Sequence, residues 1–339
     1  MHIHRPGASS GRSPVSLLIA LTAVPVLLAG AVALPAARAD SPDAPVTAGE
    51  EWPPLTVDEA DLDRSLDCHG DPAGSDRNTV LLLHGTTANA SANWSWNWEP
   101  ALAAEGRPYC TVDLPENGLQ DIQVSAENVT HAIRTIHATS GRKVDIVGHS
   151  QGGMIGRWTT KWWPDTRDMV ANMVGLGSSN NGSDMISLTC TVGCPDALRQ
   201  QGSGSDFITT LNDDGATYPG IRYTTIATRF DEIVTPYDRA FLPSADNVTN
   251  ITLQDQCPNE PVDHFLLAVS NPVWELANQA LDGNPSPSVD PGACLKLMPG
   301  VDPARLPENT GDTLLTLSGA LISTPWTQTE PGPAEYVRR

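Results

Sequence analysis

A short stretch near the middle of the chain limits the possible folds more than any other feature. It begins with a run rich in β-branched residues, 144–147, which predicts a buried strand. It ends with residues 154–163, which can form a helix that stops before a proline. Between the two stands Gly148-x-Ser150-x-Gly152. We therefore expect a strand that turns into a helix within a few residues and leaves the serine strained and exposed.

The glycines and the serine of this turn have a chemical interpretation. Side chains at positions 148 and 152 would collide, so both positions require glycine. The start of the following helix directs backbone N–H groups and a positive dipole end towards whatever Ser150 attacks. Alone, the Gly-x-Ser-x-Gly pattern is weak evidence for a nucleophilic serine, because an ordinary glycine-rich turn can have the same sequence. Between a strand and a helix it indicates the nucleophile elbow of the α/β-hydrolases.

The beginning of the chain is typical of a secretory signal peptide. A weakly basic start is followed by an apolar run over residues 15–33 and by an A-x-A pattern that ends at Ala39. An uncleaved membrane anchor is the alternative, but prolines in and after the run and the cleavage pattern argue against it. We therefore predict a signal peptide over residues 1–39 and a secreted, extracellular mature chain.

The net charge excludes some partners. The chain has 339 residues, with 20 Lys+Arg against 40 Asp+Glu. Residues 1–39 hold three arginines and no acidic residue, so the remainder has 17 basic against 40 acidic residues. The remainder therefore has a net charge of −23, and so negative a protein repels nucleic acid and anionic membranes. The roughly 300 residues after the signal suit one large α/β domain as well as two small ones.

The cysteines predict a disulfide framework. All six follow the signal, and an even number in an exported chain indicates three disulfides. Cys190-x-x-x-Cys194 could instead be half of a zinc site, but the sequence offers no matching second pair, which favours a small disulfide loop. We expect no metal and no organic cofactor. The six residues are Cys68, Cys110, Cys190, Cys194, Cys257 and Cys294.

Strand and helix patterns alternate along the chain, which predicts a doubly wound, mostly parallel sheet. The expected strands are 78–83, 109–115, 144–147, 170–174, 221–227 and 247–253, and helices are expected at 125–140, 154–163, 271–283 and 313–322. The alternation breaks down over residues 178–215, after the nucleophile unit, where this fold usually carries a lid or cap. A disordered segment is the alternative, but the two cysteines in this stretch favour an ordered lid or cap. We therefore predict a catalytic domain over 40–283 and a C-terminal extension over 284–339, tied to the core by Cys294.

A nucleophilic serine needs a base within hydrogen-bond reach and a carboxylate that orients the base. In α/β-hydrolases the order along the chain is serine, acid, histidine. His264 is the one histidine after Ser150, so it is the expected base. Asp231 alone directly follows a convincing central strand, and Glu232 is its close rival on spacing. Other competitors for the acid are Asp213, Asp214, Asp238, Asp246, Asp255 and Asp263.

From about Cys68 to Cys294 the sequence resembles the family of Candida antarctica lipase B and the related bacterial class 2 lipases. The segments that carry the resemblance are Leu83-His84-Gly85-Thr86, residues 147–153, Asp231-Glu232-Ile233-Val234-x-Pro236 and Val262-Asp263-His264. The Asp-Glu-Ile-Val-x-Pro segment is the most specific, and the resemblance implies that the acid is Asp231. The chain departs from the lipase at His149, where the lipase has tryptophan, and at His84, where it has proline.

The resemblance also implies further roles. Thr86, through its backbone and its hydroxyl, and the backbone N–H of Gln151 would form the oxyanion hole. Two family disulfides match Cys68–Cys110 and Cys257–Cys294. The pair Cys190–Cys194 has no counterpart that we can match and is assigned because its members are left over and close in sequence.

We predict a secreted serine carboxylic-ester hydrolase, a triacylglycerol lipase or esterase, with Ser150, His264 and Asp231 as its triad. A polyester depolymerase, a sterol esterase or an acyltransferase would use the same triad. A non-catalytic hydrolase-like binding protein is the alternative of another class, but binding alone does not require these three residues in this order. The expected partner is a small-molecule or lipid ester, met transiently at a lipid–water interface by a monomeric enzyme.

Overall fold

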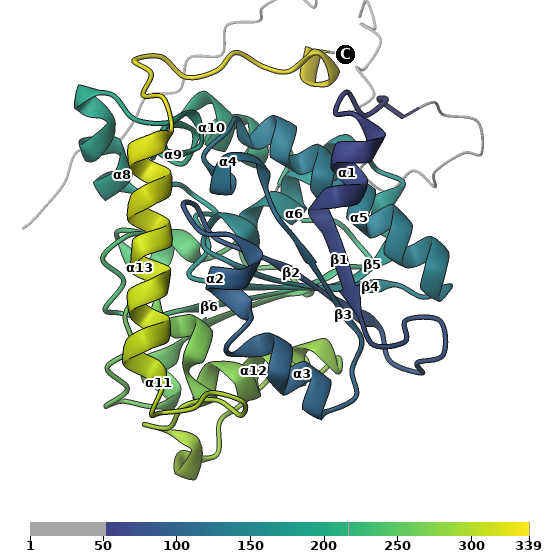
Figure 1. The fold of residues 1–339 in the computed structure, drawn as a ribbon, viewed down its shortest axis with the longest axis vertical. Coiled ribbons are helices and arrows are strands. Elements are labelled where there is room, and N and C mark those ends of the chain that lie inside the picture. The colour runs from purple at the N-terminus through teal and green to yellow at the C-terminus, as the bar shows by residue number, and fades with distance from the viewer. Residues whose placement is uncertain (1–51, 216, 339) are drawn as a thin grey trace, which may run out of the picture. The chain divides into compact units, whose positions relative to one another are not determined.

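The computed structural model describes residues 52–215 and 217–338, so the signal peptide expected over 1–39 lies outside the described residues. The described part is built on a seven-stranded sheet in the order β1-β3-β2-β4-β5-β6-β7 (Figure 1). Neighbouring strands are parallel except β1, which is antiparallel to β3. The strands are β1 (Leu66–His69), β2 (Thr79–Leu83), β3 (Tyr109–Val112), β4 (Val144–His149), β5 (Val170–Leu176), β6 (Arg222–Ala227) and β7 (Val248–Thr252).

Helices cover both faces of the sheet, and short 3-10 helices lie in the connections and near the C-terminus. The α-helices are α1 (Glu59–Ser65), α2 (Ala90–Trp94), α3 (Trp98–Ala104), α4 (Pro115–Gly118), α5 (Ile122–Ser140), α6 (Gln151–Trp162), α7 (Thr166–Met169), α8 (Asp184–Thr189), α9 (Asp196–Gln200), α10 (Asp206–Asn212), α11 (Leu253–Gln256), α12 (Asn271–Leu281) and α13 (Leu306–Ser323). The 3-10 helices are η1 (Cys190–Val192), η2 (Tyr237–Ala240), η3 (Leu266–Val269), η4 (Pro291–Ala293) and η5 (Glu335–Arg338).

The central strands are buried because both faces of the sheet are covered. Successive side chains of a strand point to opposite faces, so each strand contributes to two cores. In β2, Leu81 packs into the core that holds Ile133 of α5, whereas Leu82 packs into the core that holds Trp274 of α12. The predicted doubly wound, mostly parallel sheet is therefore confirmed.

The structure differs from the sequence-based expectation mainly at its edges. The antiparallel edge strand β1 was not predicted, because its four residues are mostly exposed and carry no apolar alternation. The helix expected over 125–140 begins at Ile122, where the Asp121 side chain accepts a hydrogen bond from Gln123 N. Within the predicted C-terminal extension, α13 is longer than the helix expected at 313–322. No helix among residues 52–215 and 217–338 has the length and apolar character needed to cross a membrane.

Residues 178–215, called here the inserted segment, follow β5 and precede β6. The segment contains α8, η1, α9 and α10. A disulfide joins Cys190 to Cys194 within it, and the other disulfides are Cys68–Cys110, which bridges paired residues of β1 and β3, and Cys257–Cys294. These are the three pairs expected from the sequence.

Residues 326–336, called here the C-terminal strap, run along the inserted segment after α13. Thr327 exchanges backbone hydrogen bonds with Cys194, at 3.1 and 2.9 Å. The carboxylate of Glu330 accepts the backbone N–H groups of Asp206 and Phe207 in the first turn of α10. Beyond the segment, Tyr336 accepts a 2.8 Å hydrogen bond from Trp158 Nε1 of α6. The strap therefore ties the inserted segment to the helices that flank the sheet.

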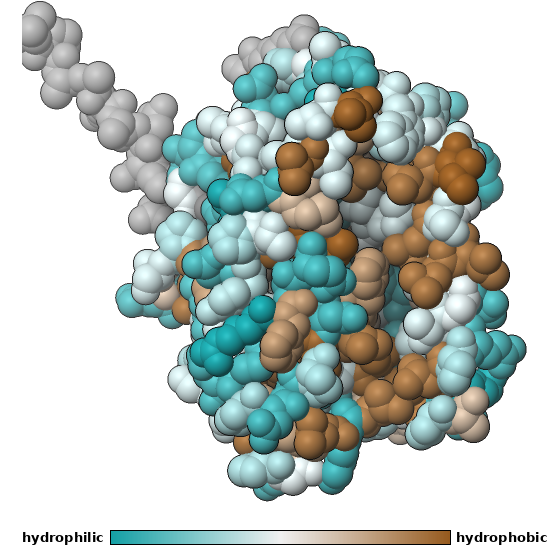
Figure 2. Space-filling model, turned by 90° about the vertical axis from the view of Figure 1, so that its left-hand side faces the viewer, coloured by the Kyte–Doolittle hydropathy of each residue, from teal (hydrophilic) through white to brown (hydrophobic). Residues whose placement is uncertain are grey.

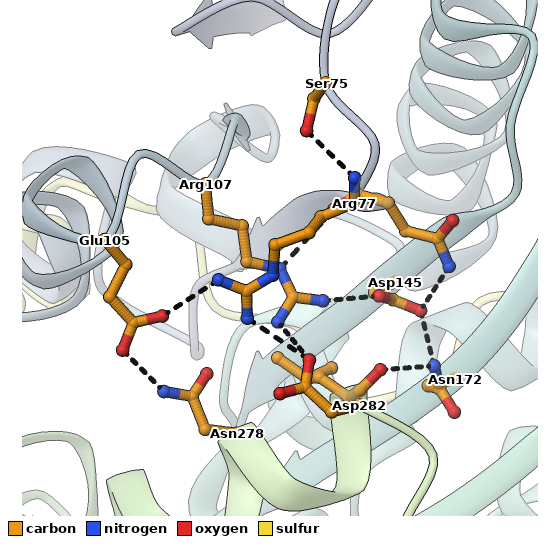
Figure 3. Close-up of polar contacts among 10 residues, drawn as sticks. Ser75, Arg77, Glu105, Arg107, Asp145, Asn172, Asn278 and Asp282 are labelled. Carbon is orange, nitrogen blue, oxygen red and sulfur yellow. Dashed lines mark hydrogen bonds and ion pairs between the residues drawn. The ribbon is translucent and has the colours of Figure 1, made fainter.

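A buried ion pair lies at the amino ends of the central strands, at the opposite end from the elbow. Arg107 Nη2 is 2.7 Å from Asp145 Oδ2, and each side chain is 1% exposed. Asn172 of β5 donates a 2.6 Å hydrogen bond to Asp145 Oδ1, and Arg107 also reaches the more exposed Asp282 (Figure 3). Burial raises the pKa of Asp145 and lowers the pKa of Arg107, while the attraction between the two charges opposes both shifts.

The two carboxylates around Arg107 should differ sharply in their effect on stability. Asp145→Ala leaves a buried guanidinium without its partner, so we expect the free energy of unfolding to fall by about 3–5 kcal/mol. Asp282→Ala is the matched control, because its carboxylate is 60% exposed and such pairs contribute about 1 kcal/mol or less. Urea unfolding with the disulfides intact measures both; equal losses would contradict the prediction.

Candidate active site

The turn after β4 has the strained geometry expected of an elbow. Ser150 stands between the end of β4 and the start of α6, with φ 54° and ψ −122°. Positive φ is uncommon for a residue with a side chain and costs conformational energy. Ser150 is, however, only 7% exposed. The expected strain is present, but the serine lies inside a cavity rather than on the surface, because the inserted segment and α13 line the space around it.

The glycines of the elbow are required by close backbone contacts. A Cβ atom on Gly148 would lie 2.1 Å from the carbonyl oxygen of Gly152, and one on Gly152 would lie 2.1 Å from the carbonyl oxygen of Leu83. Backbone atoms cannot move aside as a flexible side chain can. Positions 148 and 152 therefore accept only glycine, as the motif predicted.

The structure brings Asp231 and His264 into direct contact. Asp231 follows β6, His264 lies in the loop after α11, and His264 Nδ1 is 2.9 Å from Asp231 Oδ2. The other carboxylate oxygen accepts backbone hydrogen bonds from Ile233 at 3.0 Å and Val234 at 2.7 Å, which fixes the carboxylate. Glu232, the rival acid, contacts the backbone N–H of His264 at 3.3 Å rather than the ring.

Ser150 and His264 line one cavity of about 620 Å³. Its walls come from the loop after β2, the inserted segment, the loop around His264, and α13. Most of the lining is apolar, including Ile186, Leu198, Ile233, Leu317 and Leu321. Figure 2 shows hydrophobic side chains around a hollow on the face that carries α13. Trp96 also lines the cavity, whereas Trp94 and Trp98 are fully buried and pack in the core.

His149 holds the loop that carries His264. Its Nε2 is 2.9 Å from the backbone carbonyl oxygen of His264. A carbonyl can only accept, so Nε2 carries the proton and donates it. Burial first, and the neighbouring His264 second, lower the pKa of His149 to about 3. His149 is therefore neutral at pH 7 and positions the backbone of the neighbouring histidine.

His84 holds the loop that carries Thr86 through hydrogen bonds to the backbone. Its Nε2 accepts the backbone N–H of Leu114 at 2.9 Å, which leaves Nδ1–H to donate to the carbonyl oxygen of Gly85 at 2.8 Å. Burial lowers the pKa of His84. Both histidines that depart from the lipase pattern are thus neutral side chains, and they fix the loops that carry Thr86 and His264.

The two residues expected to form an oxyanion hole lie at the same edge of the sheet. Thr86 follows β2 and lines the cavity beside Ser150. Gln151 is the first residue of α6, where a backbone N–H has no acceptor within the helix. Gln201, which the sequence analysis did not single out, donates from Nε2 to the Thr86 hydroxyl at 2.8 Å. It lies 115 residues from Thr86, and no sequence pattern links the two.

The alternative of a zinc half-site at Cys190 and Cys194 is not realised. Cys190 and Cys194 form a disulfide and so cannot be half of a zinc site. Within the described part of the chain, no cluster of three or more His, Cys, Asp or Glu residues could hold a metal ion.

The buried neutral state of His149 predicts a pH dependence of stability. In the unfolded chain histidine titrates near its ordinary value of about 6.5, so between that pH and about 3 the unfolded chain binds the extra proton. The folded state is fully favoured above that window and loses stability as the pH falls through it. From pH 7 to pH 5 we expect wild type to lose about 2 kcal/mol more than His149→Gln.

His149→Gln retains a side-chain N–H for the His264 carbonyl but does not titrate. His84 and the carboxylates are common to both proteins, so their titration cancels in the comparison. Urea unfolding at several pH values gives the difference. Parallel stability curves for the two proteins would show that His149 titrates normally.

Comparison with known proteins places this geometry in a family. A model described as the alpha/beta hydrolase family matches residues 80–315. The chain is 28% identical to lipase B of Pseudozyma antarctica over 195 residues, which cover 55% of this chain and 57% of that lipase. It is 29% identical to a 2-hydroxy-6-oxononadienedioate/2-hydroxy-6-oxononatrienedioate hydrolase of Klebsiella pneumoniae over 146 residues, 41% of this chain and 49% of that protein. The chain thus matches about half the length of these two relatives.

Solved structures give the same result over more of the chain. The crystal structure of Aspergillus fumigatus lipase B superposes with a TM-score of 0.76 and 28% identity, and the match covers 84% of this chain and 73% of that one. The family model spans more than half of the chain, and the fold agrees with it. This chain therefore belongs to the alpha/beta hydrolase family, and within it the chain is similar to lipase B.

Proposed function

We propose that this protein is a secreted carboxylic-ester hydrolase of the lipase type, which works through an acyl-enzyme intermediate. The observation that supports this most is the arrangement of three side chains around one cavity. Ser150 occupies a strained turn, and His264 faces the same cavity with its far nitrogen 2.9 Å from Asp231. Binding alone would not need a buried imidazole–carboxylate pair beside a strained serine.

In the first half of the proposed reaction, Ser150 Oγ attacks the ester carbonyl carbon. His264 Nε2 takes the hydroxyl proton, and Asp231 orients the ring and stabilises its charged form. The negative charge that develops on the carbonyl oxygen is stabilised by Thr86 and by the backbone N–H of Gln151. The tetrahedral intermediate collapses, His264 passes the proton to the leaving alcohol, and the acyl group remains on Ser150.

In the second half, water replaces the alcohol. His264 accepts a proton from the attacking water, the same oxyanion hole stabilises the second tetrahedral intermediate, and collapse releases the carboxylic acid. The proton returns to Ser150 Oγ. The enzyme is restored without a cofactor entering any step.

The cavity favours an uncharged substrate with an apolar acyl or alcohol group. Among the described residues that line it there is no lysine or arginine, and Asp263 is the one acidic side chain. Burying an ester chain of this kind against leucine and isoleucine side chains is favourable at roughly 25 cal/mol per Å². A free charge would enter without a partner, which is costly.

The surface around the cavity carries exposed apolar side chains, which would favour contact with a layer of lipid ester. Exposed apolar side chains occur on the inserted segment, on α13 and at the start of the C-terminal strap; they are Leu188, Val192, Leu314, Leu315, Ile322 and Trp326. The acidic remainder of the surface opposes binding to anionic membranes. We therefore propose transient contact of a monomer with a neutral lipid–water interface, under a cap formed by the inserted segment, after export and removal of residues 1–39.

The triad predicts losses of activity that do not add. Ser150→Ala and His264→Ala should each lower kcat by several orders of magnitude, on the order of 10⁶ in a comparable serine hydrolase. Because the residues act as one unit, the double variant should be about as slow as either single variant. Rates are measured with a chain-length series of nitrophenyl esters. Losses that multiply would contradict the assignment.

A fluorophosphonate probe tests the nucleophile directly. Wild type should be labelled at Ser150, Ser150→Ala should not, and the surface variant Ser140→Ala should be labelled as wild type. Peptide mapping identifies the modified residue. Unlabelled but folded wild type would favour a non-catalytic binding protein.

A further inference from the structure

The Thr86 hydroxyl is held by two buried glutamine side chains. Gln201 Nε2 lies 2.8 Å and Gln151 Nε2 lies 3.1 Å from Thr86 Oγ1. Gln201 is 1% exposed and Gln151 fully buried, so water does not compete for these contacts. The two glutamines approach from different elements, since Gln151 begins α6 and Gln201 directly follows α9 of the inserted segment.

The orientation of both amide groups is fixed by backbone carbonyls. Gln201 Nε2 also donates to the carbonyl oxygen of Ala197 at 3.0 Å, and Gln151 Nε2 also donates to that of Gly118 at 2.9 Å. A carbonyl cannot donate, so the nitrogen end of each amide must face it. Each amide therefore donates one N–H to a backbone carbonyl and the other to the Thr86 hydroxyl. On the far side of its amide, Gln201 Oε1 accepts from Ser179 at 2.9 Å.

These contacts determine what the Thr86 hydroxyl can still do. A hydroxyl has one hydrogen to donate and two lone pairs that accept. The two glutamine N–H groups occupy both lone pairs. Neither contact uses the hydroxyl hydrogen, and Thr86 lines the cavity beside Ser150. The carbonyl oxygen of an ester bound beside Thr86 would therefore face the hydroxyl hydrogen, which can donate to it, and not a lone pair, which would repel it.

We propose that the side chains of Gln201 and Gln151 are positioning residues that hold the Thr86 hydroxyl as a hydrogen-bond donor to the oxyanion. This inference rests on the proposed ester hydrolysis. A preorganised donor stabilises charge that appears in the transition state more than it strengthens binding of the neutral ester. Orienting the Gln151 amide in this way reduces stability, because its Oε1 is buried without a hydrogen-bond partner among the described residues.

The proposal gives the inserted segment a chemical role. Gln201 belongs to that segment, so the oxyanion hole is complete only while the segment is in place. If the segment moved away, the hydroxyl would lose one of its two donors. It could then turn a lone pair towards the substrate oxygen, and the hole would be weakened.

Gln201→Met tests the proposal, because methionine keeps the shape of the side chain but removes both amide N–H groups. We expect kcat to fall about tenfold with KM little changed, less than the 10²–10³ that follows complete loss of an oxyanion donor. Thr86→Val should cause that larger loss. In the Thr86→Val background, Gln201→Met should change kcat less than about twofold, because there is no hydroxyl left to orient.

Gln200→Met is the matched control. Gln200 is the neighbouring residue, is equally buried, and bonds to Ile122 and Asp121 rather than to Thr86. It should keep wild-type kcat even if its stability falls. Losses at Gln201 and Thr86 that multiply, a change confined to KM, or an equal kcat loss in Gln200→Met would overturn the proposal.

Two further variants cover the case in which Gln201→Met does not fold. Ser179→Ala frees the oxygen end of the Gln201 amide, and Gln201→Asn shortens the side chain so that it no longer reaches Thr86. Both are judged by the same comparison with the Thr86→Val background. Fluorophosphonate labelling keeps the two proposals separate: wild type that resists the probe refutes the hydrolase, whereas labelled wild type with unchanged Gln201 variants refutes the positioning role alone.

Discussion

The structure depends on how closely the backbone of α6 approaches the end of β2. A Cβ on Gly152 would be 2.1 Å from Leu83 O, so the helix can start where it does only because this residue has no side chain. That approach brings the start of α6 beside the loop that carries Thr86, and Ser150, at the turn between β4 and α6, has φ 54°. The strain at one residue is offset by the burial of the whole strand–helix unit.

The sequence was sufficient where the physical requirement is local. A pair of glycines around a serine predicts a strained turn, and apolar runs predict central strands, because each requirement is met within about ten residues. The choice of Asp231 over Glu232 needed either the family resemblance or the structure, because adjacent carboxylates look alike until one faces the imidazole. The pairing of Gln201 with Thr86 could not be predicted, because it depends on how the inserted segment folds back.

Polar networks set the geometry at both ends of the sheet, but in different ways. At the amino ends, Arg107 and Asp145 face each other as charges, and the surrounding fold must compensate for their burial. At the carboxyl ends, His84 and His149 are neutral, and each fixes a loop through hydrogen bonds of its ring. A neutral scaffold leaves the field around Ser150 to the Asp231–His264 pair and to the N–H groups of the elbow.

The C-terminal part of the chain has a consequence for the order of biosynthesis. Residues of α13 and Trp326 form one wall of the cavity, and the strap that follows fastens the inserted segment through Thr327 and Glu330. A ribosome makes all of these residues after the seven strands. A nascent chain can therefore complete its sheet and its elbow before the residues of one cavity wall have been made, so the cavity is among the last features of the molecule to form.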